Sequence, residues 1–203
     1  MTKKGAKSLL ITAFEPFGGN SLNSSWELAK NIMPIEGVEM VKIQLPVSFS
    51  KVETSLEEAL KRINPDIVLM LGQTAKRTEV NIENVAVNWL ESKKSDNDGL
   101  TPTGKKIDEN GPTSYFSTLP IMSICQSAKD KGLSMKISDS AVTFVCKYTF
   151  YMMGRMASKM KNPPLFGFLH IPKITNLQEG GCLSMNEMLS SIEMVIRETI
   201  KAR

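Results

Sequence analysis

Residues 66–71 read Asp-Ile-Val-Leu-Met-Leu (DIVLML), an almost unbroken apolar run that Gly72 follows. A strand covered on both faces reads as a continuous apolar run, whereas a half-exposed strand alternates between apolar and polar residues. The run therefore predicts a buried strand at the centre of a largely parallel sheet. We expect Gly72 to end this strand.

Short apolar runs alternate with helix-period segments on both sides of this strand, which is typical of an α/β domain. No repeat, low-complexity tract or linker interrupts the pattern, so a single domain over residues 1–203 is predicted. Extended segments are expected over residues 8–12, 38–47, 79–87, 141–145 and 165–171, and helices over residues 24–32, 52–63, 118–131, 148–161 and 188–200. The polar stretch 91–112 is expected to be a long loop.

Three of the expected helices are preceded by the S-x-x-E spacing of a capping box, in which a serine and a glutamate satisfy each other's backbone N–H groups. The three pairs are Ser24 with Glu27, Ser50 with Glu53, and Ser184 with Glu187. Each pair predicts a helix N-terminus at its serine.

The composition excludes several classes of protein. The 203 residues are 41% hydrophobic and 23% charged, enough to bury a sizeable core. The net charge of +4 is spread over scattered lysines and only 6% of residues are aromatic, so no nucleic-acid partner is predicted. No apolar stretch approaches the ~18 residues of a membrane span, so no membrane partner is predicted.

The counts of histidine and cysteine limit the possible chemistry. One histidine, His170, rules out a two-histidine metal site within one chain, and any mechanism that needs an imidazole must use it. Three separated cysteines without a C-x-x-C pair fit a reducing compartment, and the N-terminus lacks the pattern of a signal peptide. The predicted location is the cytoplasm.

The motifs of phosphate-loop, dinucleotide-binding and α/β-hydrolase serine sites are absent, which leaves a cysteine–histidine site. Cys146 lies where an apolar run gives way to a helical segment, and helix N-terminal amides favour a thiolate and can bind an oxyanion. A buried structural cysteine is the alternative at this point, as it is for Cys125 and Cys182. His170 ends an expected strand, where sites of open α/β sheets gather. Sequence spacing alone does not choose an acid for it.

Four segments, in order along the chain, carry a resemblance to a known family. They are FEPFGG at 14–19 with Asn23, GQ at 72–73 with ENVAVN at 83–88, SAVTFVC at 140–146, and GFLHIP at 167–172 with Gln178. Together they resemble the signatures of the pyrrolidone-carboxylate peptidases (pyroglutamyl peptidase type I). The likeness spans about residues 7–200.

The resemblance implies a cysteine exopeptidase that removes the N-terminal pyroglutamyl residue from peptides through a thioester, without metal or organic cofactor. It implies a three-layer α/β/α sandwich around a twisted, mostly parallel mixed sheet, assembled as a homotetramer. By match to the family's motifs, Cys146 is the nucleophile, His170 the general base and acid, and Glu83 the orienting carboxylate. The implied substrate-binding residues are Phe14, Phe17 and Phe144 around the ring, Gln73 at its polar edge, and Asn23 beside the pocket.

These residue types suit the substrate. Pyroglutamate is a neutral lactam without a free α-amine, so an apolar slot with an amide at one edge can hold it and reject rings that lack that edge. The chain departs from the family pattern at Val142, usually glycine, at Lys147-Tyr148 after the nucleophile, and at Ser24, where proline is common. For Lys147 we expect a solvated side chain pointing away from the thiol.

Two other functions stay open at this point. The departures around Cys146 keep alive a catalytically weakened member that binds N-capped peptides or cyclic amides. Analogy of fold alone suggests a ribosyl transferase of the nucleoside phosphorylase type, although the phosphate site it would need is not found in the sequence.

Overall fold

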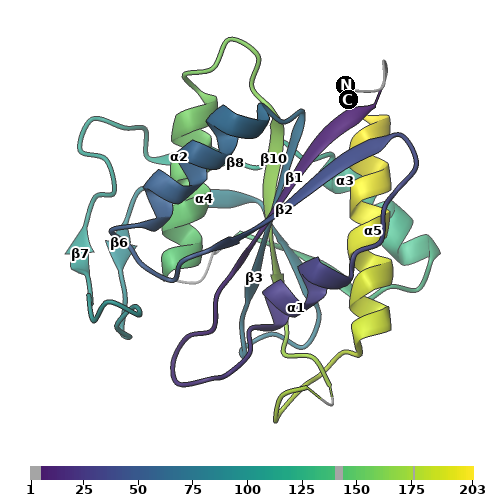
Figure 1. Cartoon of the computed structure of the whole chain (residues 1–203), viewed down its shortest axis with the longest axis horizontal. Helices are drawn as coiled ribbons and strands as arrows, with labels where there is room; N and C mark the ends of the chain where they lie inside the picture. Colours follow the sequence, from purple (N-terminus) through teal and green to yellow (C-terminus); the bar gives the residue numbers. More distant parts are fainter. Residues whose placement is uncertain (1–5, 140–143, 176) are drawn as a thin grey trace.

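A six-stranded sheet forms the centre of the computed structural model, which describes residues 6–139, 144–175 and 177–203 (Figure 1). Neighbouring strands run parallel except for the pair β10–β4, which is antiparallel. The order is β2 (Val38–Leu45), β1 (Lys7–Phe14), β3 (Ile67–Gln73), β10 (Leu165–Ile171), β4 (Val80–Glu83) and β9 (Met135–Ser138). All seven residues of β3 are buried, which confirms the predicted central strand.

Helices cover both faces of the sheet. One face carries α1 (Ser24–Asn31), α3 (Ile121–Asp130) and α5 (Met185–Lys201), and the other carries α2 (Val52–Ile63) and α4 (Val145–Ala157) (Figure 1). The expected α/β/α arrangement around a mostly parallel mixed sheet is therefore confirmed.

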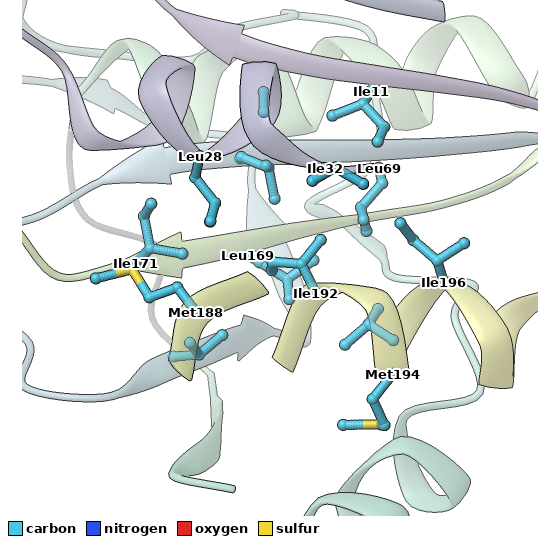
Figure 2. Close-up of a cluster of buried hydrophobic side chains, with 14 of the residues drawn as sticks. Ile11, Leu28, Ile32, Leu69, Leu169, Ile171, Met188, Ile192, Met194 and Ile196 are labelled. Carbon is cyan, nitrogen blue, oxygen red and sulfur yellow. The ribbon is translucent and has the colours of Figure 1, made fainter. Parts of the chain in front are cut away.

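Two hydrophobic cores, one on each face, hold the layers together. Figure 2 shows the first: Leu28 of α1 and Ile32, directly after that helix, lie in one cluster with Met188, Ile192 and Ile196 of α5 and side chains of the central strands. The second core holds Phe150 and Met153 of α4 against Phe168 of β10, and Leu56 of α2 belongs to the same cluster. Apolar residues that point alternately to the two faces of each strand thus supply both cores.

The stretch 91–112 is less irregular than its composition suggests. β6 (Leu90–Glu91) pairs with β7 (Thr103–Lys105), and β5 (Val85–Val87) pairs with β8 (Ser114–Phe116) just outside the stretch. Its middle is tied down by Asp96, whose carboxylate accepts the backbone N–H groups of Phe49, Asp98 and Leu100 at 2.8–3.0 Å. The expectation of a plain loop is therefore wrong at Glu91 and over Thr103–Lys105.

Two of the predicted capping boxes are absent. Asn23, not Ser24, caps α1 by accepting the N–H of Ser25, and Glu27 pairs with Lys30 instead. Lys51 precedes α2 without a side-chain cap, and Glu53 bonds Tyr148 and Arg155 of α4. Glu27 thus pairs within its own helix, three residues on, whereas Glu53 is taken by tertiary partners on α4. The third box, Ser184 with Glu187 on α5, is confirmed.

Two boundaries and one strand also differ from the prediction. β3 continues through Gly72 to Gln73, because parallel pairing with β10 extends to that residue. α4 begins at Val145 rather than Tyr148, and the short strand β9 was not expected. No helix among the described residues is long and apolar enough to cross a membrane.

Candidate active site

A buried histidine–carboxylate pair lies on the strands β10 and β4. In their antiparallel register Phe168 is opposite Glu83, so His170 and Glu83 are diagonal neighbours on one face of the sheet. His170 Nδ1 lies 2.8 Å from Glu83 Oε1, and the two side chains are 1% and 0% exposed. Because a carboxylate accepts, Nδ1 carries the proton and Nε2 keeps its lone pair.

Cys146 is the second residue of α4, a helix whose N-terminus has no side-chain cap. The site is completed by Gly72 of β3, which is the register partner of His170. A Cβ at Gly72 would lie 3.0 Å from Cys146 Sγ and 2.7 Å from Phe168 Cζ. Because Gly72 has no side chain, Cys146 Sγ can pack against the β3 backbone, next to the strand β10 that carries His170.

Burial dominates the electrostatics of the thiol. It raises the pKa of Cys146 to about 12; the residue's own backbone N–H opposes this rise, and the charge of Glu83 adds to it. The resting thiol is therefore protonated at neutral pH and needs a base to become a nucleophile. His170 Nε2 has no hydrogen-bond partner in the described part of the chain, so it is free to act as that base.

Cys146 and His170 both line one cavity of about 370 Å³. Glu83 does not line it and lies behind His170. A second, smaller space of about 10 Å³ adjoins Cys146, and the sequence predicted most of its lining: Phe14, Phe17, Asn23, Gln73 and Phe144, joined by Val47 and Val145. The structure thus brings the expected nucleophile, base and pocket residues together.

The apolar slot is made by aromatic rings from distant segments. Phe17 follows β1 and its ring centroid lies 5.7 Å from that of Phe144, which precedes α4. Phe14 ends β1 and stacks obliquely on Phe168 at 6.3 Å. Free space of about 10 Å³ holds about one water molecule. A five-membered ring enters only if Phe17 or Phe144, both half-buried, moves aside.

Two amide side chains fix the polar side of the slot. Asn23 Nδ2 donates to the backbone oxygen of Glu15 at 2.8 Å, while its Oδ1 caps α1 by accepting the N–H of Ser25. Asn23 thus links the segment after β1, which carries Phe17, to the start of α1. Gln73, the last residue of β3, accepts the N–H of Ser24 through Oε1 at 2.6 Å. Gln73 is buried and lines both cavities.

Lys147 differs from its expectation. Its side chain is 3% exposed rather than solvated, because α4 begins early enough to turn this position toward the protein. Burial lowers the pKa of Lys147, and the carboxylate of Glu91 opposes that shift. Residues 140–143 of the expected nucleophile segment, which include Val142, lie outside the described residues.

Several residues that line the large cavity were not predicted as site residues. They lie directly after β3, after β6 and after β10: Thr74, Ala75, Lys76, Ser92, Lys93, Lys94 and Lys173, with Asn20 near Phe17. The rule that sites gather beyond the carboxyl ends of parallel strands could have found those after β3 and β10. Over the described ranges, no group of three or more metal-ligating side chains comes together.

Comparison with known proteins gives a consistent result. The family model described as pyroglutamyl peptidase matches residues 7–201. Pyrrolidone-carboxylate peptidase 1 of Caldanaerobacter subterraneus subsp. tengcongensis is 38% identical over 200 residues, covering 96% of this chain and 98% of that protein. The corresponding protein of Clostridium perfringens is 34% identical, covering 95% of this chain and 92% of its own length.

Solved structures agree. Pyroglutamyl peptidase I from Bacillus amyloliquefaciens superposes with a TM-score of 0.89 at 34% identity, covering 96% of this chain and 95% of its own. Pyrrolidone carboxyl peptidase from Thermococcus litoralis gives a TM-score of 0.90 at 30% identity, with coverages of 96% and 94%.

Proposed function

Because the chain belongs to the pyroglutamyl peptidase family, we propose that it is a cysteine exopeptidase that removes the N-terminal pyroglutamyl residue from peptides. The observation that carries the proposal is the buried His170–Glu83 pair: His170 lines the cavity that Cys146 also lines, and its Nε2 has no hydrogen-bond partner among the described residues. This is the nucleophile, base and orienting acid of a cysteine hydrolase.

The reaction begins with proton transfer. His170 Nε2 accepts the Cys146 proton as Sγ attacks the pyroglutamyl carbonyl carbon, and Glu83 stabilises the imidazolium through Nδ1–H. Collapse of the tetrahedral intermediate breaks the C–N bond, and the imidazolium protonates the departing amine. Water, deprotonated by the same imidazole, then hydrolyses the thioester and returns the proton to the thiol.

The first turn of α4 is placed to bind the developing oxyanion. The N-cap residue, Phe144, provides no side-chain cap, and the Lys147 N–H already donates to the backbone oxygen of Phe144 at 3.1 Å. The backbone N–H groups of Val145 and Cys146 have no acceptor within the helix and can serve a ligand, and the helix dipole favours a negative charge there. Donors of this kind typically contribute 10²–10³-fold to turnover.

The lactam ring is held between Phe14, Phe17 and Phe144, with the Gln73 carboxamide at its polar edge and Asn23 supporting the loop. A neutral, largely apolar slot excludes the ammonium group that an ordinary peptide N-terminus would bring, because burying an unpaired charge is costly. The slot therefore selects a cyclised N-terminus.

The remaining assignments are proposals of the same kind. We propose a single domain over residues 1–203, a cytoplasmic location, a homotetrameric assembly, and activity without a metal or organic cofactor, nucleic acid or membrane. The length of 203 residues without a repeat or linker supports the single domain, and the separated cysteines support the cytoplasmic location. The modest net charge supports the absence of a nucleic-acid partner, and the family resemblance supports the assembly and the cofactor assignment.

Hydrolysis of a pyroglutamyl chromogenic amide by the reduced, purified protein tests the function. We expect turnover that is lost in His170→Ala. The raised thiol pKa favours one alternative, a catalytically weakened member that binds N-capped peptides or cyclic amides without cleaving them. Binding of such a peptide without turnover by the wild type would establish that alternative instead.

A further inference from the structure

Four lysines surround the cavity of about 370 Å³ that holds Cys146 and His170. We call them the lysine rim: Lys76 after β3, Lys93 and Lys94 after β6, and Lys173 after β10. No carboxylate lines this cavity, and none of the four lysines forms an ion pair within the described ranges. Lys173 only donates to the backbone oxygen of Glu179, at 3.1 Å.

The lysine rim has no counterpart in the ring that the slot accepts, because that ring is neutral. The part of the substrate that meets the rim is the peptide beyond the scissile bond, which extends from Cys146 into the open cavity. Like charges gathered at the mouth of a cleft attract opposite charges and raise the rate of association. The matching chemistry is a carboxylate close to the scissile bond.

We propose that the protein prefers pyroglutamyl substrates with a carboxylate immediately beyond the scissile bond, supplied by an acidic side chain or by the free C-terminus of a very short peptide. The preference rests on the proposed function, since it concerns the departing part of the same substrate. It acts on KM and on association rather than on the chemistry at Cys146.

Two matched substrate pairs separate the two sources of the carboxylate. Pyroglutamyl-aspartyl and pyroglutamyl-asparaginyl peptides with amidated C-termini test the side chain, and pyroglutamyl-alanine against its amide tests the terminus. We expect kcat/KM to be about tenfold higher for the acid in at least one pair at low salt, and the difference to shrink at about 0.5 M salt, where the Debye length falls below ~5 Å.

The double variant Lys93→Gln/Lys94→Gln should lower that acid-to-neutral ratio several-fold. Lys61→Gln is the matched control, because Lys61 is an exposed lysine that pairs with Glu57 on α2, away from this cavity, and the ratio should not change. Ratios near one in both pairs, with the neutral substrates hydrolysed, would overturn the preference alone. Failure to hydrolyse any pyroglutamyl substrate would overturn the proposed function, and the preference with it.

An independent observation concerns the orientation of the Gln73 carboxamide. The Ser24 N–H donates to Gln73 across 2.6 Å, and only the carboxamide oxygen can accept it. Nε2 must then lie on the other side of the group, and it has no hydrogen-bond partner among the described residues. Since Gln73 lines both cavities, this side of the carboxamide offers a donor to a ligand in the slot.

We infer that Ser24 is a positioning residue whose backbone N–H holds Gln73 with its NH₂ group toward the lactam, where it donates to the ring carbonyl oxygen. This inference also rests on the proposed function. Selectivity at the polar edge then depends on the ring C=O more than on the ring N–H, because a buried donor without its acceptor is costly.

Ser24→Pro removes this N–H with little disturbance. Proline is favoured at the first helical position, and Asn23 already has the extended conformation (φ −124°, ψ 117°) that a following proline requires. Ser24→Ala is the matched control: it keeps the N–H and loses only the hydroxyl, which contacts Gln178 Oε1 at 2.6 Å and the N–H of Ile174 at 3.0 Å.

The readout is the ratio of kcat/KM for a 3-oxocyclopentanecarbonyl amide to that for a cyclopentanecarbonyl amide, which isolates the ring carbonyl. We expect a ratio of about ten or more in the wild type and in Ser24→Ala, falling several-fold in Ser24→Pro. A purely structural role of Ser24 would lower both rates and leave the ratio unchanged. A wild-type ratio near one, or the same ratio in Ser24→Pro as in the wild type, would overturn the inference.

Discussion

The N-termini of α5 and α4 differ in how the first backbone N–H groups of the helix find hydrogen-bond partners. At α5 the side chain of Ser184 accepts the N–H of Glu187, and the Glu187 carboxylate accepts the N–H of Ser184, so a full capping box satisfies the helix end. At α4 the preceding residue is Phe144, which has no side-chain cap to offer, and Cys146 follows in the first turn.

The capped N-terminus of α5 contributes to stability, whereas the N-terminus of α4 serves the site. A helix leaves its first N–H groups without internal partners, and side chains, water or a ligand must satisfy them. The α5 end is satisfied by its own side chains and packs against the first core. The α4 end borders the cavity, and its first two N–H groups, of Val145 and Cys146, have no acceptor within the helix and can serve a ligand that binds beside Cys146. Variants at the two ends should therefore fail in different assays.

The largest effect is expected at the open end. Cys146→Ala should lower turnover of a pyroglutamyl amide by at least about 10³-fold while leaving the thermal unfolding midpoint near that of the wild type, because the thiol is the reacting group. Cys182→Ala is the control, since Cys182 is exposed and does not line the cavity. Retained turnover in Cys146→Ala would sink the mechanism.

The next largest effect is expected at Glu83, the carboxylate that orients the proposed base His170. Glu83→Gln should lower kcat by about 10²–10⁴-fold yet leave measurable activity, because the carboxylate orients His170 and does not react. Glu79→Gln, in the segment before β4, is the control, since Glu79 pairs with exposed Lys136. Equal kcat in Glu83→Gln and the wild type would show that Glu83 is the wrong acid.

A substitution at Gly72 is expected to lower both the stability and the activity. In Gly72→Ala the new Cβ would meet Phe168 Cζ at 2.7 Å and Cys146 Sγ at 3.0 Å. Overpacking of this kind costs about 1–3 kcal/mol of the free energy of unfolding, and displacement of the sulfur should lower kcat as well. Chemical denaturation and steady-state kinetics measure the two losses. A variant with wild-type stability and kcat would contradict the close packing of β3 against Cys146.

The two ends should also respond to opposite extremes of pH. Burial raises the pKa of Cys146 from 9.0 to about 12, so its contribution to stability is full below pH 9 and is lost as the pH rises toward 12. Hydrogen bonds from Ser184 lower the pKa of Glu187 from 4.5, so its contribution is present above that pH and is lost as the pH falls.

Unfolding free energies across the pH range check these signs. The wild type should lose more stability than Cys146→Ala on the alkaline side, and more than Glu187→Gln on the acid side. Parallel curves for the wild type and Cys146→Ala above pH 9 would show that the thiol is not buried in the neutral form.

The smallest effect is expected at the capped end. Ser184→Ala should lower the free energy of unfolding by about 1 kcal/mol and leave kcat unchanged, because it removes only the cap of a structural helix. Chemical denaturation and kinetics on the same preparation measure both. A clear change in kcat in Ser184→Ala would contradict the view that the α5 end serves stability alone.

Much of the fold could be predicted because its signals are local. The continuous run 66–71 indicated a central strand, and the Ser184–Glu187 spacing gave a true cap. The same spacing failed at Ser24, where Asn23 caps the helix and Glu27 pairs with Lys30 of the same helix, and at Ser50, where Glu53 bonds Tyr148 of α4. Propensity cannot weigh a cap against a partner about 100 residues away.

The site shows the same division. Sequence reasoning from residue types reached Cys146 and His170 but could not choose an acid, and only the family resemblance pointed to Glu83. The antiparallel register of β4 and β10, which brings Glu83 to His170, is a long-range property. The burial of Lys147 was missed because the start of α4 was placed three residues late. The lysine rim was missed because its members come from three separate segments.

Trapping of the acyl-enzyme tests the central claim most directly, namely that Cys146 attacks the pyroglutamyl carbonyl with His170 as its base. During turnover of a pyroglutamyl ester, acid quench followed by mass spectrometry of the digested protein should find the pyroglutamyl group as a thioester on Cys146, and none in Cys146→Ala. A wild type that turns over the ester while Cys146 stays unmodified at every time point, or an adduct on Cys125 or Cys182 instead, would contradict the account.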